Sequence, residues 1–419
     1  MTSPDQTLEA VYRAEWGRLL ALLLARTRRL DLVEDALGEA FARAAEHWHR
    51  DGVPDNPSGW LYATAYRQVV SRVRAEAVAA RKAPLLAVRA DWEPPDEHLE
   101  QLGDDQLHLI LLCCHPALPP ESRSALALRL VVGTSTAQIA RLFLVPTTTM
   151  AARLTRAKRK IVRAGIPLGP PPGDELRSRI DEVCRTIYLA FTAGYTPGDG
   201  PELLRADVAG EAVRLASVLH DLVPDAPQVR SLLALLLLQH SRRDARQQHG
   251  QLVTLAEQDR SLWHRHQIRA GLALVDALQP DQGYAEELRL QALIAAQHAL
   301  AATAAETDWT AIADHYAALE ALTGSPIVRL NRAVAVAEAH TPQAGLTLLA
   351  ELDDALPDNH RVPAVRAELA RRAGDINLSR TSYRTAIDLC TNNVEKAYLL
   401  DKFSNLPAAA PDPRPKGHH

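Results

Sequence analysis

Long apolar runs, signal sequences and disulfide frameworks are all missing from this sequence of 419 residues. No stretch approaches the roughly 20 apolar residues that a transmembrane helix needs, so we expect no membrane partner. The first residues lack the basic and then apolar pattern of a signal peptide, which predicts a cytoplasmic protein. The chain has four cysteines, two of them adjacent at Cys113 and Cys114, and this pattern does not predict a disulfide framework.

The motifs of common catalytic and cofactor sites are also missing. The sequence contains no P-loop, GxGxxG, HExxH or GxSxG pattern, and no motif groups its histidines with an acid or a nucleophile. Cys113, Cys114 and His115 are contiguous and have no second ligand pair at zinc-site spacing, so we interpret the cysteines as core residues. We therefore predict a protein that is not an enzyme, with no catalytic residues, no metal site and no cofactor.

The composition favours an all-α fold. Aromatic residues make up only 5% of the chain and β-branched residues are sparse, whereas Ala, Leu and Arg are abundant. Stretches rich in proline and glycine mark the expected boundaries between folded blocks. The predicted organisation is a helical domain at 1–80, a linker at 81–100, a helix-turn-helix domain at 101–166, a linker at 167–173, a helical repeat-like extension at 174–405 and a disordered tail at 406–419.

Charge is distributed unevenly along the chain, although the net charge is only −4. Residues 1–170 hold 22 basic and 19 acidic residues, and residues 171–419 hold 25 and 32. Within the first part, Ser122 to Pro172 contains nine basic residues and no acidic one. This segregation predicts an anionic partner for one local surface.

Residues 138–160, QIARLFLVPTTTMAARLTRAKRK, predict two amphipathic helices on a tight turn. The threonines before the second helix could supply a capping hydroxyl. That helix has an apolar face, formed by Met150, Leu154, Ala157 and Ile161. A second stripe is basic, with Arg153, Arg156, Lys160 and Arg163 in line and Lys158 and Arg159 beside them. This is the helix-turn-helix arrangement, whose second helix enters the major groove of DNA.

The sequence of the first folded block, residues 1–80, predicts two further amphipathic helices. Asp31 and Glu34 resemble a capping box before VEDALGEAFARAAEHW, and the polar face of that helix carries Glu34, Asp35, Glu39 and Arg43. Its apolar set is Val33, Leu37, Ala40, Phe41, Ala44 and Trp48. In the next helix Asn56 can cap and Pro57 can occupy the first turn. Arg67, Ser71 and Arg74 share one side of it. Taken alone, both polar faces are typical of ordinary helix surfaces.

The third folded block, residues 174–405, is predicted to be a series of amphipathic helices. Two of its segments resemble each other at a distance of 34 residues. RAVAVAEAHTPQ begins at Arg332 and RAELARRAGDIN begins at Arg366, and this offset is the period of tetratricopeptide repeats. Gly374 and Asp375 are predicted to form the turn of the second copy. We interpret QDRSLW (258–263) and TDW (307–309) as helix caps with a packed tryptophan rather than ligand sites.

These segments together resemble a known family, the extracytoplasmic-function (group 4) sigma factors of bacteria. VEDALGEAFARAAEHW followed by NPSGWLYATAYRQVVSRVR is similar to their region 2, and TAQIARLFLVPTTTMAARLTRAKRKI is similar to their region 4. The Leu-Val-Pro turn and later segments such as IYLAFTAGYT, EQDRSLW and TDWTAIADHYAAL resemble a subtype with a tetratricopeptide-like C-terminal extension. The resemblance covers about residues 8–400.

The resemblance implies a sigma factor that binds core RNA polymerase and directs initiation at specific promoters. Its partners would be promoter DNA, the β′ clamp helices and the β flap. The extension is expected to regulate activity, either by contacting polymerase or by folding over the basic second block and masking it. Polymerase contacts are expected at Asp35 and Glu39, with Phe41 mainly packing. Readers of the −10 element are expected at Arg67, Ser71, Arg72 and Arg74. Readers of the −35 element are expected at Thr147, Thr148, Ala151, Arg153, Arg156, Arg159 and Lys160.

Two other interpretations fit parts of the sequence. A conventional helix-turn-helix regulator with a repeat-based sensor for a ligand or protein would explain the second and third blocks but has no need of the first. A repeat scaffold whose helix-turn-helix no longer binds DNA would show no salt-dependent DNA binding. The sequence leaves open the promoter sequence, the inducing signal and the oligomeric state. It also leaves open whether the extension activates or inhibits, and whether the C-terminal histidines are native.

Overall fold

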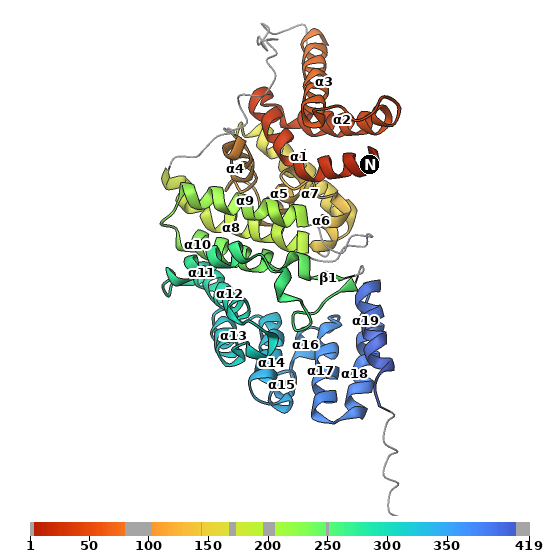
Figure 1. The fold of residues 1–419 in the computed structure, drawn as a ribbon. Helices are drawn as coiled ribbons and strands as arrows, with labels where there is room; N and C mark the ends of the chain where they lie inside the picture. Colours follow the sequence, from red (N-terminus) through yellow and green to blue (C-terminus); the bar gives the residue numbers. More distant parts are fainter. Residues whose placement is uncertain are drawn as a thin grey trace, which may run out of the picture. The chain divides into compact units, whose positions relative to one another are not determined.

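The structure of the protein is a computed structural model that describes residues 4–79, 102–143, 145–166, 173–195, 206–248 and 251–407 (Figure 1). The described chain is almost entirely α-helical, with one short antiparallel ladder between β1 (Gln247–Gln248) and β2 (Gln251–Leu252). The all-α prediction is therefore confirmed. None of the described helices is long and apolar enough to cross a bilayer. The predicted linker at 81–100, residues 167–172 of the second linker and the tail from residue 408 lie outside the described residues.

The helices divide into two compact units. Unit one comprises residues 1–196 and 204–236, and unit two comprises residues 197–203 and 237–419. Unit one begins with α1 (Pro4–Thr27), α2 (Leu30–Asp51) and α3 (Pro57–Ala79), which we call module one. Module two follows with α4 (Leu102–Cys113), α5 (Pro120–Leu130), α6 (Thr136–Leu142) and α7 (Thr147–Arg163). The unit ends with α8 (Gly173–Tyr195), α9 (Ala206–Leu222) and most of α10 (Pro227–His240).

The apolar faces expected from sequence spacing are buried in both modules. All six residues of the apolar set predicted for α2 are buried, and so are the four predicted for α7. In α3 the buried apolar residues are Leu61, Ala65 and Val69. These side chains recur at helical spacing, so burying one stripe of each helix removes most of its apolar surface from water.

The expected helix caps were partly wrong. Asn56 does cap α3, because its Oδ1 accepts a hydrogen bond from the Gly59 amide at 2.8 Å. The threonines do not cap α7, whose N-cap is Pro146 without a side-chain hydrogen bond. The capping box at Asp31 and Glu34 does not form either, because α2 already begins at Leu30.

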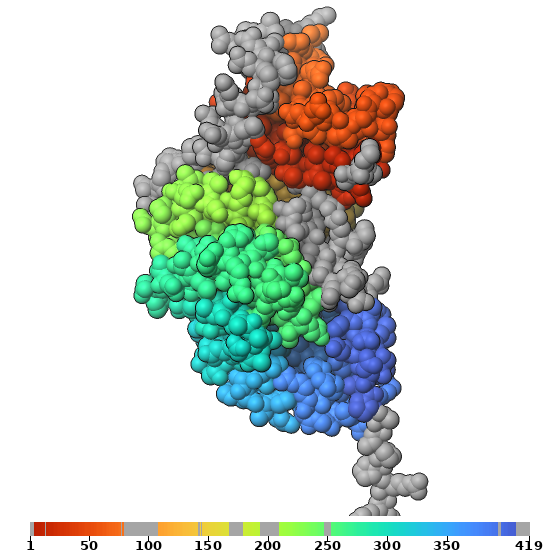
Figure 2. Space-filling view, viewed as in Figure 1, coloured from red at the N-terminus to blue at the C-terminus, as the bar shows by residue number. Residues whose placement is uncertain are grey.

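Helices α8 and α9 belong to the same packed unit as the two modules. They pair with each other, α9 packs on α1 and α4, and α8 packs on α4 and α5. Figure 2 shows the surface of this pair beside that of α1. Phe191 on α8 is fully buried, and the Cys114 thiol on the α4 side lies 3.3 Å from the Thr186 hydroxyl. The first part of the extension therefore completes the hydrophobic core around module two.

The cysteines of this region are core residues, as the sequence predicted. Cys113 and Cys114 are buried and unbridged, and burial raises the pKa of the Cys114 thiol to about 12. A thiol with such a pKa stays protonated at neutral pH and is a poor metal ligand or nucleophile.

Unit two consists mainly of successive helical hairpins (Figure 1). It contains α11 (Arg265–Asp276), α12 (Gly283–Leu300), α13 (Trp309–Thr323), α14 (Pro326–Ala339), α15 (Pro342–Leu348), α16 (Leu352–Ala355), α17 (Arg361–Ala373), α18 (Ile376–Leu389) and α19 (Asn393–Ser404). The short 3-10 turns η3 (Arg243–Ala245) and η4 (Arg260–Leu262) precede α11, and η5 (Ala304–Glu306) lies between α12 and α13. Neighbouring helices pair as α12 with α13, α14 with α15 and α17 with α18.

The turn predicted at Gly374 and Asp375 is present between α17 and α18. Gly374 has a φ of +85°, which favours glycine, and the Asp375 carboxylate accepts a hydrogen bond from the Leu378 amide at 2.9 Å. Helix pairs of this kind are compatible with tetratricopeptide-like repeats, a classification that stays a prediction.

The segment QDRSLW is a helix cap with a packed tryptophan, as the sequence predicted. Asp259 caps η4 by accepting a hydrogen bond from the Ser261 amide at 2.8 Å, and Trp263 is buried. The Arg260 guanidinium lies over the Trp263 ring and donates to the carbonyl oxygens of His298 and Ala301, each at 2.6 Å. Arg260 thereby satisfies carbonyl groups that the end of α12 leaves without a helical partner.

We expect Arg260→Ala to lower the free energy of unfolding by about 2 kcal/mol, because two carbonyl groups lose a charged donor. Arg260→Lys should restore only part of this, since one ammonium group cannot reproduce the planar fork of the guanidinium. Denaturant unfolding followed by circular dichroism measures the change. Arg265→Ala, an exposed arginine on α11, is the matched control and should change stability little.

Candidate nucleic-acid interface

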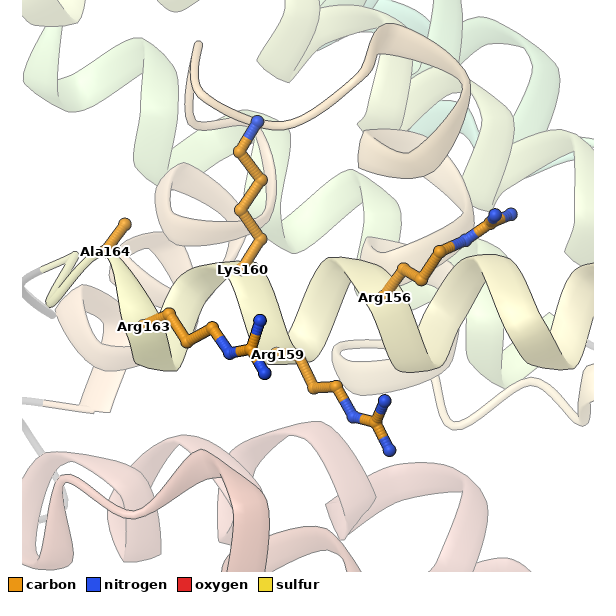
Figure 3. Close-up of a pocket in the computed structure, with 5 residues that line it drawn as sticks. All are labelled: Arg156, Arg159, Lys160, Arg163 and Ala164. Carbon is orange, nitrogen blue, oxygen red and sulfur yellow. The ribbon is translucent and has the colours of Figure 1, made fainter.

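The basic surface predicted on α7 is exposed and continuous. A surface concavity is lined by four exposed cations of this helix, Arg156, Arg159, Lys160 and Arg163 (Figure 3). They form two pairs, Arg156 with Lys160 and Arg159 with Arg163, and the two residues of each pair are one helical turn apart. In Figure 3, Arg159 and Arg163 extend from one side of the helix, and Arg156 and Lys160 from the other. Four cations on one exposed helix form a surface that phosphates can approach.

The N-terminal end of α7 presents the other residues expected to read DNA. Thr147, Thr148 and Ala151 are exposed, and Arg153 is half-buried. This end of a recognition helix is the part that contacts base edges in helix-turn-helix proteins. The expected −35 readers therefore all lie on α7 with solvent access, and their contacts with DNA stay a prediction.

Helix α6 is held in place by a reciprocal cap. The Ser135 amide donates to Gln138 Oε1 at 3.0 Å, and the Gln138 amide donates to Ser135 Oγ at 3.2 Å. Ile139 and Ala140 are buried, and α6, the first helix of the pair, packs against α7, the second. Leu144, which the sequence places in the turn between them, lies outside the described residues.

Lys158 does not belong to the basic surface, although the sequence placed it beside the stripe. Its Nζ donates to Glu34 Oε2 of α2 at 2.7 Å. The other Glu34 oxygen accepts a hydrogen bond from Arg129 Nε of α5 at 2.8 Å. The side chain of Glu34 is 8% exposed, so one buried carboxylate of module one is paired with two cations of module two.

The sequence placed Glu34 on the solvent face of α2 with Asp35 and Glu39, and this expectation was wrong. Position 34 lies at the edge of the apolar stripe, where α7 packs on α2 and the Arg129 side chain of α5 reaches the carboxylate. Burial acts to raise the pKa of Glu34, but the charges of Lys158 and Arg129 outweigh it, so the pKa is lowered. Glu34 therefore stays ionised at neutral pH. Only the partners on distant helices reveal its role, and sequence spacing carries no signal for them.

On α3, three of the four residues expected to read the −10 element are exposed, namely Arg67, Ser71 and Arg74. The fourth, Arg72, forms an ion pair with Glu39, one of the expected polymerase contacts. Because both side chains are in contact with water, this ion pair adds little stability, and either residue can exchange it for another partner.

The expected polymerase contacts on α2 divide into exposed and buried residues. Asp35 and Glu39 are exposed. Phe41 is 7% exposed and packs edge-on against the Tyr12 ring at a centroid distance of 5.0 Å. Its side chain is accordingly placed to pack within module one, the role the sequence analysis gave it.

One group of potential metal ligands occurs among the described residues. Ligand atoms of His360, Cys390 and Glu395 in unit two lie within 4.8 Å of one another. Glu395 is already paired with His360 at 2.9 Å and with Arg361 at 3.2 Å, and its amide is capped by the Asn392 side chain. These partners account for the group as a tie between α17 and the start of α19, so we assign no metal to it.

Comparison with known proteins agrees with this geometry. Residues 11–78 match the model for sigma-70 region 2, and residues 108–161 match the model for sigma-70 region 4. Residues 179–279 match a family of unknown function, DUF6596. The chain is 38% identical over 406 residues to an uncharacterized protein of Rhizobium meliloti (strain 1021), with 93% of each chain covered. No solved structure matches the chain.

The matched segments coincide with the two modules and with the helices that follow them. Region 2 spans α1 to α3 and contains the exposed acidic residues of α2, and region 4 includes α6 and most of the basic helix α7. Proteins with sigma-70 regions 2 and 4 are transcription initiation factors, and these families are not enzymes. The chain therefore belongs to the sigma-70 factors, with regions 2 and 4 followed by a helical C-terminal extension that includes a DUF6596 domain.

Proposed function

We propose that this sigma factor is of the extracytoplasmic-function type and reads promoters with α3 on the −10 element and α7 on the −35 element. The observation that carries the proposal is the exposed basic surface of α7 in a region 4 match that follows a region 2 match. Arginine and lysine contacts with phosphate would supply affinity, and the N-terminal residues of α7 would supply specificity. A single-module regulator would have no use for region 2, which favours the sigma role over a conventional regulator.

Module one would also bind the polymerase, with the exposed carboxylates of Asp35 and Glu39 meeting the β′ clamp helices. Region 4 would contact the β flap. A protein with these partners would act in the cytoplasm, where the polymerase is. The reaction chemistry would belong to the polymerase, since a sigma factor supplies binding and positioning.

The extension is proposed to regulate these activities. Its first helices, α8 and α9, pack directly on α1, α4 and α5 and so are part of the unit that carries both DNA-facing helices. A change in these contacts would change the arrangement of the modules. Unit two, with its helical hairpins, is a natural place for a regulatory signal to bind.

The proposal is tested by run-off transcription with purified bacterial core polymerase and a library of genomic promoter fragments. We expect the full-length protein to give transcripts with defined start sites, enriched in one pair of −10 and −35 sequences. Core polymerase alone, and core with an unrelated sigma factor, are the controls. Transcripts without a common promoter sequence would refute promoter recognition by this chain.

Regulation by the extension is tested by a truncation at the boundary between the two compact units. Removing residues 241–419 leaves all of unit one in place, whereas a cut at residue 174 would remove α8 and α9, with the buried Phe191, and expose the helices they cover. We expect the 1–240 chain to fold and to transcribe at a rate at least about threefold different from the full-length protein, at equal occupancy of core. Such a change corresponds to about 0.7 kcal/mol of coupling. Equal rates would refute regulation by unit two.

A further inference from the structure

Four exposed cations of α7 form no ion pair within the described parts of the chain. They line the concavity of Figure 3, which we call the basic concavity, and are Arg156, Arg159, Lys160 and Arg163. Lys158 on the same helix differs from them, because its Nζ donates to Glu34 Oε2 at 2.7 Å. The sequence from Ser122 to Pro172 contains no acidic residue, so the surrounding segment supplies no counter-charge. The four charges are therefore available to an anion from outside the chain.

The arrangement of these cations weakens α7 itself. Both pairs of the basic concavity place like charges four residues apart, and like charges at this spacing destabilise a helix. The helix dipole favours cations near the end of α7 at Arg163 and offsets part of this repulsion. On α17, by contrast, the exposed Arg371 is paired with Glu368 at 2.7 Å. A bound anion would remove the repulsion on α7 in the way that Glu368 neutralises Arg371.

We propose that the basic concavity binds a small multivalent phosphate, a linear chain of three or more linked phosphate groups, in competition with promoter DNA. An inorganic chain and the 5′ chain of a nucleotide both have this chemistry. Successive phosphates of such a chain share one bridging oxygen, whereas a whole sugar separates them in DNA. The chain therefore brings more negative charge to the same length of helix. The competition rests on the proposed function, and the anion site itself is independent of it.

The spacing of the donors fits a short chain of phosphates. The cations extend from Arg156 to Arg163, about 10 Å along the helix axis, and the members of each pair are about 6 Å apart along it. Each arginine presents a planar fork that donates to two phosphate oxygens, and Lys160 adds three donors. A chain lying between the two pairs can accept hydrogen bonds from all four side chains. A single phosphate would reach fewer of them.

The lining predicts recognition of phosphate groups without recognition of a base. Among the described residues it consists of arginine, lysine and Ala164, with neither an aromatic ring nor a side chain that accepts hydrogen bonds. Bases are bound mainly by stacking on aromatic rings and by hydrogen bonds to both donors and acceptors on their edges. An inorganic chain and a nucleotide with equally many phosphates should therefore bind about equally well.

A phosphate chain in the basic concavity would lower promoter binding without changing promoter preference. Three of its cations, Arg156, Arg159 and Lys160, are also expected contacts of the −35 element. Phosphate contacts supply affinity, whereas base edges carry the sequence information. Thr147 and Thr148, at the base-reading end of α7, do not line the concavity and would stay uncovered. We therefore expect all promoter sequences to lose affinity by the same factor.

Calorimetric titration of the free, full-length protein with sodium tripolyphosphate tests the site. In metal-free buffer at constant ionic strength we expect saturable one-to-one binding, at least about tenfold tighter than that of inorganic phosphate, because more charged contacts form. ATP is the nucleotide probe and should bind about as tightly as tripolyphosphate. ATP binding more than about tenfold tighter would overturn recognition through phosphate groups alone.

Paired substitutions locate the binding. Arg159→Gln with Arg163→Gln should weaken tripolyphosphate binding at least about tenfold, because one side of the basic concavity loses both charges. Arg156→Gln with Lys160→Gln should weaken it to a similar extent from the other side. Glutamine is a good helix former and these side chains are exposed, so circular dichroism should show unchanged helicity.

The matched control is Arg265→Gln with Arg269→Gln on α11. These arginines are also exposed and four residues apart, and they lie outside the basic concavity. Their replacement should leave tripolyphosphate binding unchanged. Equal affinity in the unchanged protein and in both α7 variants, or no saturable binding at all, would overturn the site. Binding no tighter than that of sulfate at equal ionic strength would also overturn it, because it would show only a general attraction of anions.

Competition is measured with a labelled promoter duplex and the free protein. Tripolyphosphate should raise the apparent Kd for DNA in proportion to its concentration, beyond the effect of sodium chloride at equal ionic strength. The ranking of promoter sequences should stay the same. Unchanged DNA affinity at saturating tripolyphosphate would overturn the competition. A protein that binds tripolyphosphate through α7 but neither binds promoters nor initiates with core polymerase would refute the proposed function and leave the anion site standing.

Discussion

Replacing Arg156 and Arg159 by glutamine is expected to weaken holoenzyme binding to promoter DNA by about 30-fold or more. Each exposed cation on α7 that contacts phosphate or a base edge contributes roughly 1–3 kcal/mol, and two such losses multiply in affinity. Both side chains line the exposed concavity, so their removal should not affect the fold. Fluorescence anisotropy with a labelled promoter measures the loss.

Salt dependence distinguishes phosphate contacts from other causes of weak binding. If both arginines contact phosphate, the slope of log affinity against log salt should become less steep by about 2. The double replacement of Arg265 and Arg269 by glutamine, at exposed positions on α11, removes the same charge and is the matched control. An unchanged slope together with unchanged affinity would show that α7 does not contact DNA.

The second large effect is expected from Asp35→Arg on α2, which should weaken binding to core polymerase by about 30-fold, or about 2 kcal/mol. The exposed carboxylate makes no contact that the fold requires, so reversing its charge acts on the partner alone. Glu39→Arg should have a similar effect, but it also places like charges together by removing the partner of Arg72. Asp35 is therefore the cleaner test.

Binding to core polymerase is measured by titrating labelled sigma factor into core and following anisotropy. Glu46→Arg, an exposed residue later on α2, is the matched control. If Asp35→Arg and Glu46→Arg bind core equally well, α2 is not the docking helix at this position. Thermal unfolding of each variant should show the same transition, because neither position is buried.

Local patterns allowed much of the fold and of the candidate interface to be predicted. The spacing of Met150, Leu154, Ala157 and Ile161 predicted which face of α7 is buried, because one stripe of an amphipathic helix packs inward. Asn56 before Pro57 predicted the start of α3. The same periodicity placed Arg156 and Lys160 on the exposed side.

Contacts between segments far apart in the sequence could not be predicted in this way. Glu34 has the spacing of a surface residue, but its partners Arg129 and Lys158 follow it by 95 and 124 residues. Nothing in the sequence near Gly17 reveals that the Val131 carbonyl oxygen approaches it. The threonine cap of α7 failed because the backbone enters the helix at Pro146, where no hydroxyl faces the free amides.

The extension illustrates the same limit at a larger scale. Its proline-rich start at 167–173 predicted a separate third block, but α8 and α9 pack against helices of both modules. Burial of Phe191 and Ile187 explains this, since amphipathic helices next to an incomplete core bury their apolar faces there. Helical periodicity indicates that a face is buried and does not indicate the surface that covers it.

The most direct test of the central claim is an equilibrium titration of full-length protein with purified bacterial core RNA polymerase, followed by run-off transcription from the complex. The account predicts one-to-one binding that Asp35→Arg weakens, and initiation at a promoter that the complex recognises. No binding to core, with salt-dependent binding to duplex DNA retained through α7, would contradict it and would indicate a conventional helix-turn-helix regulator instead.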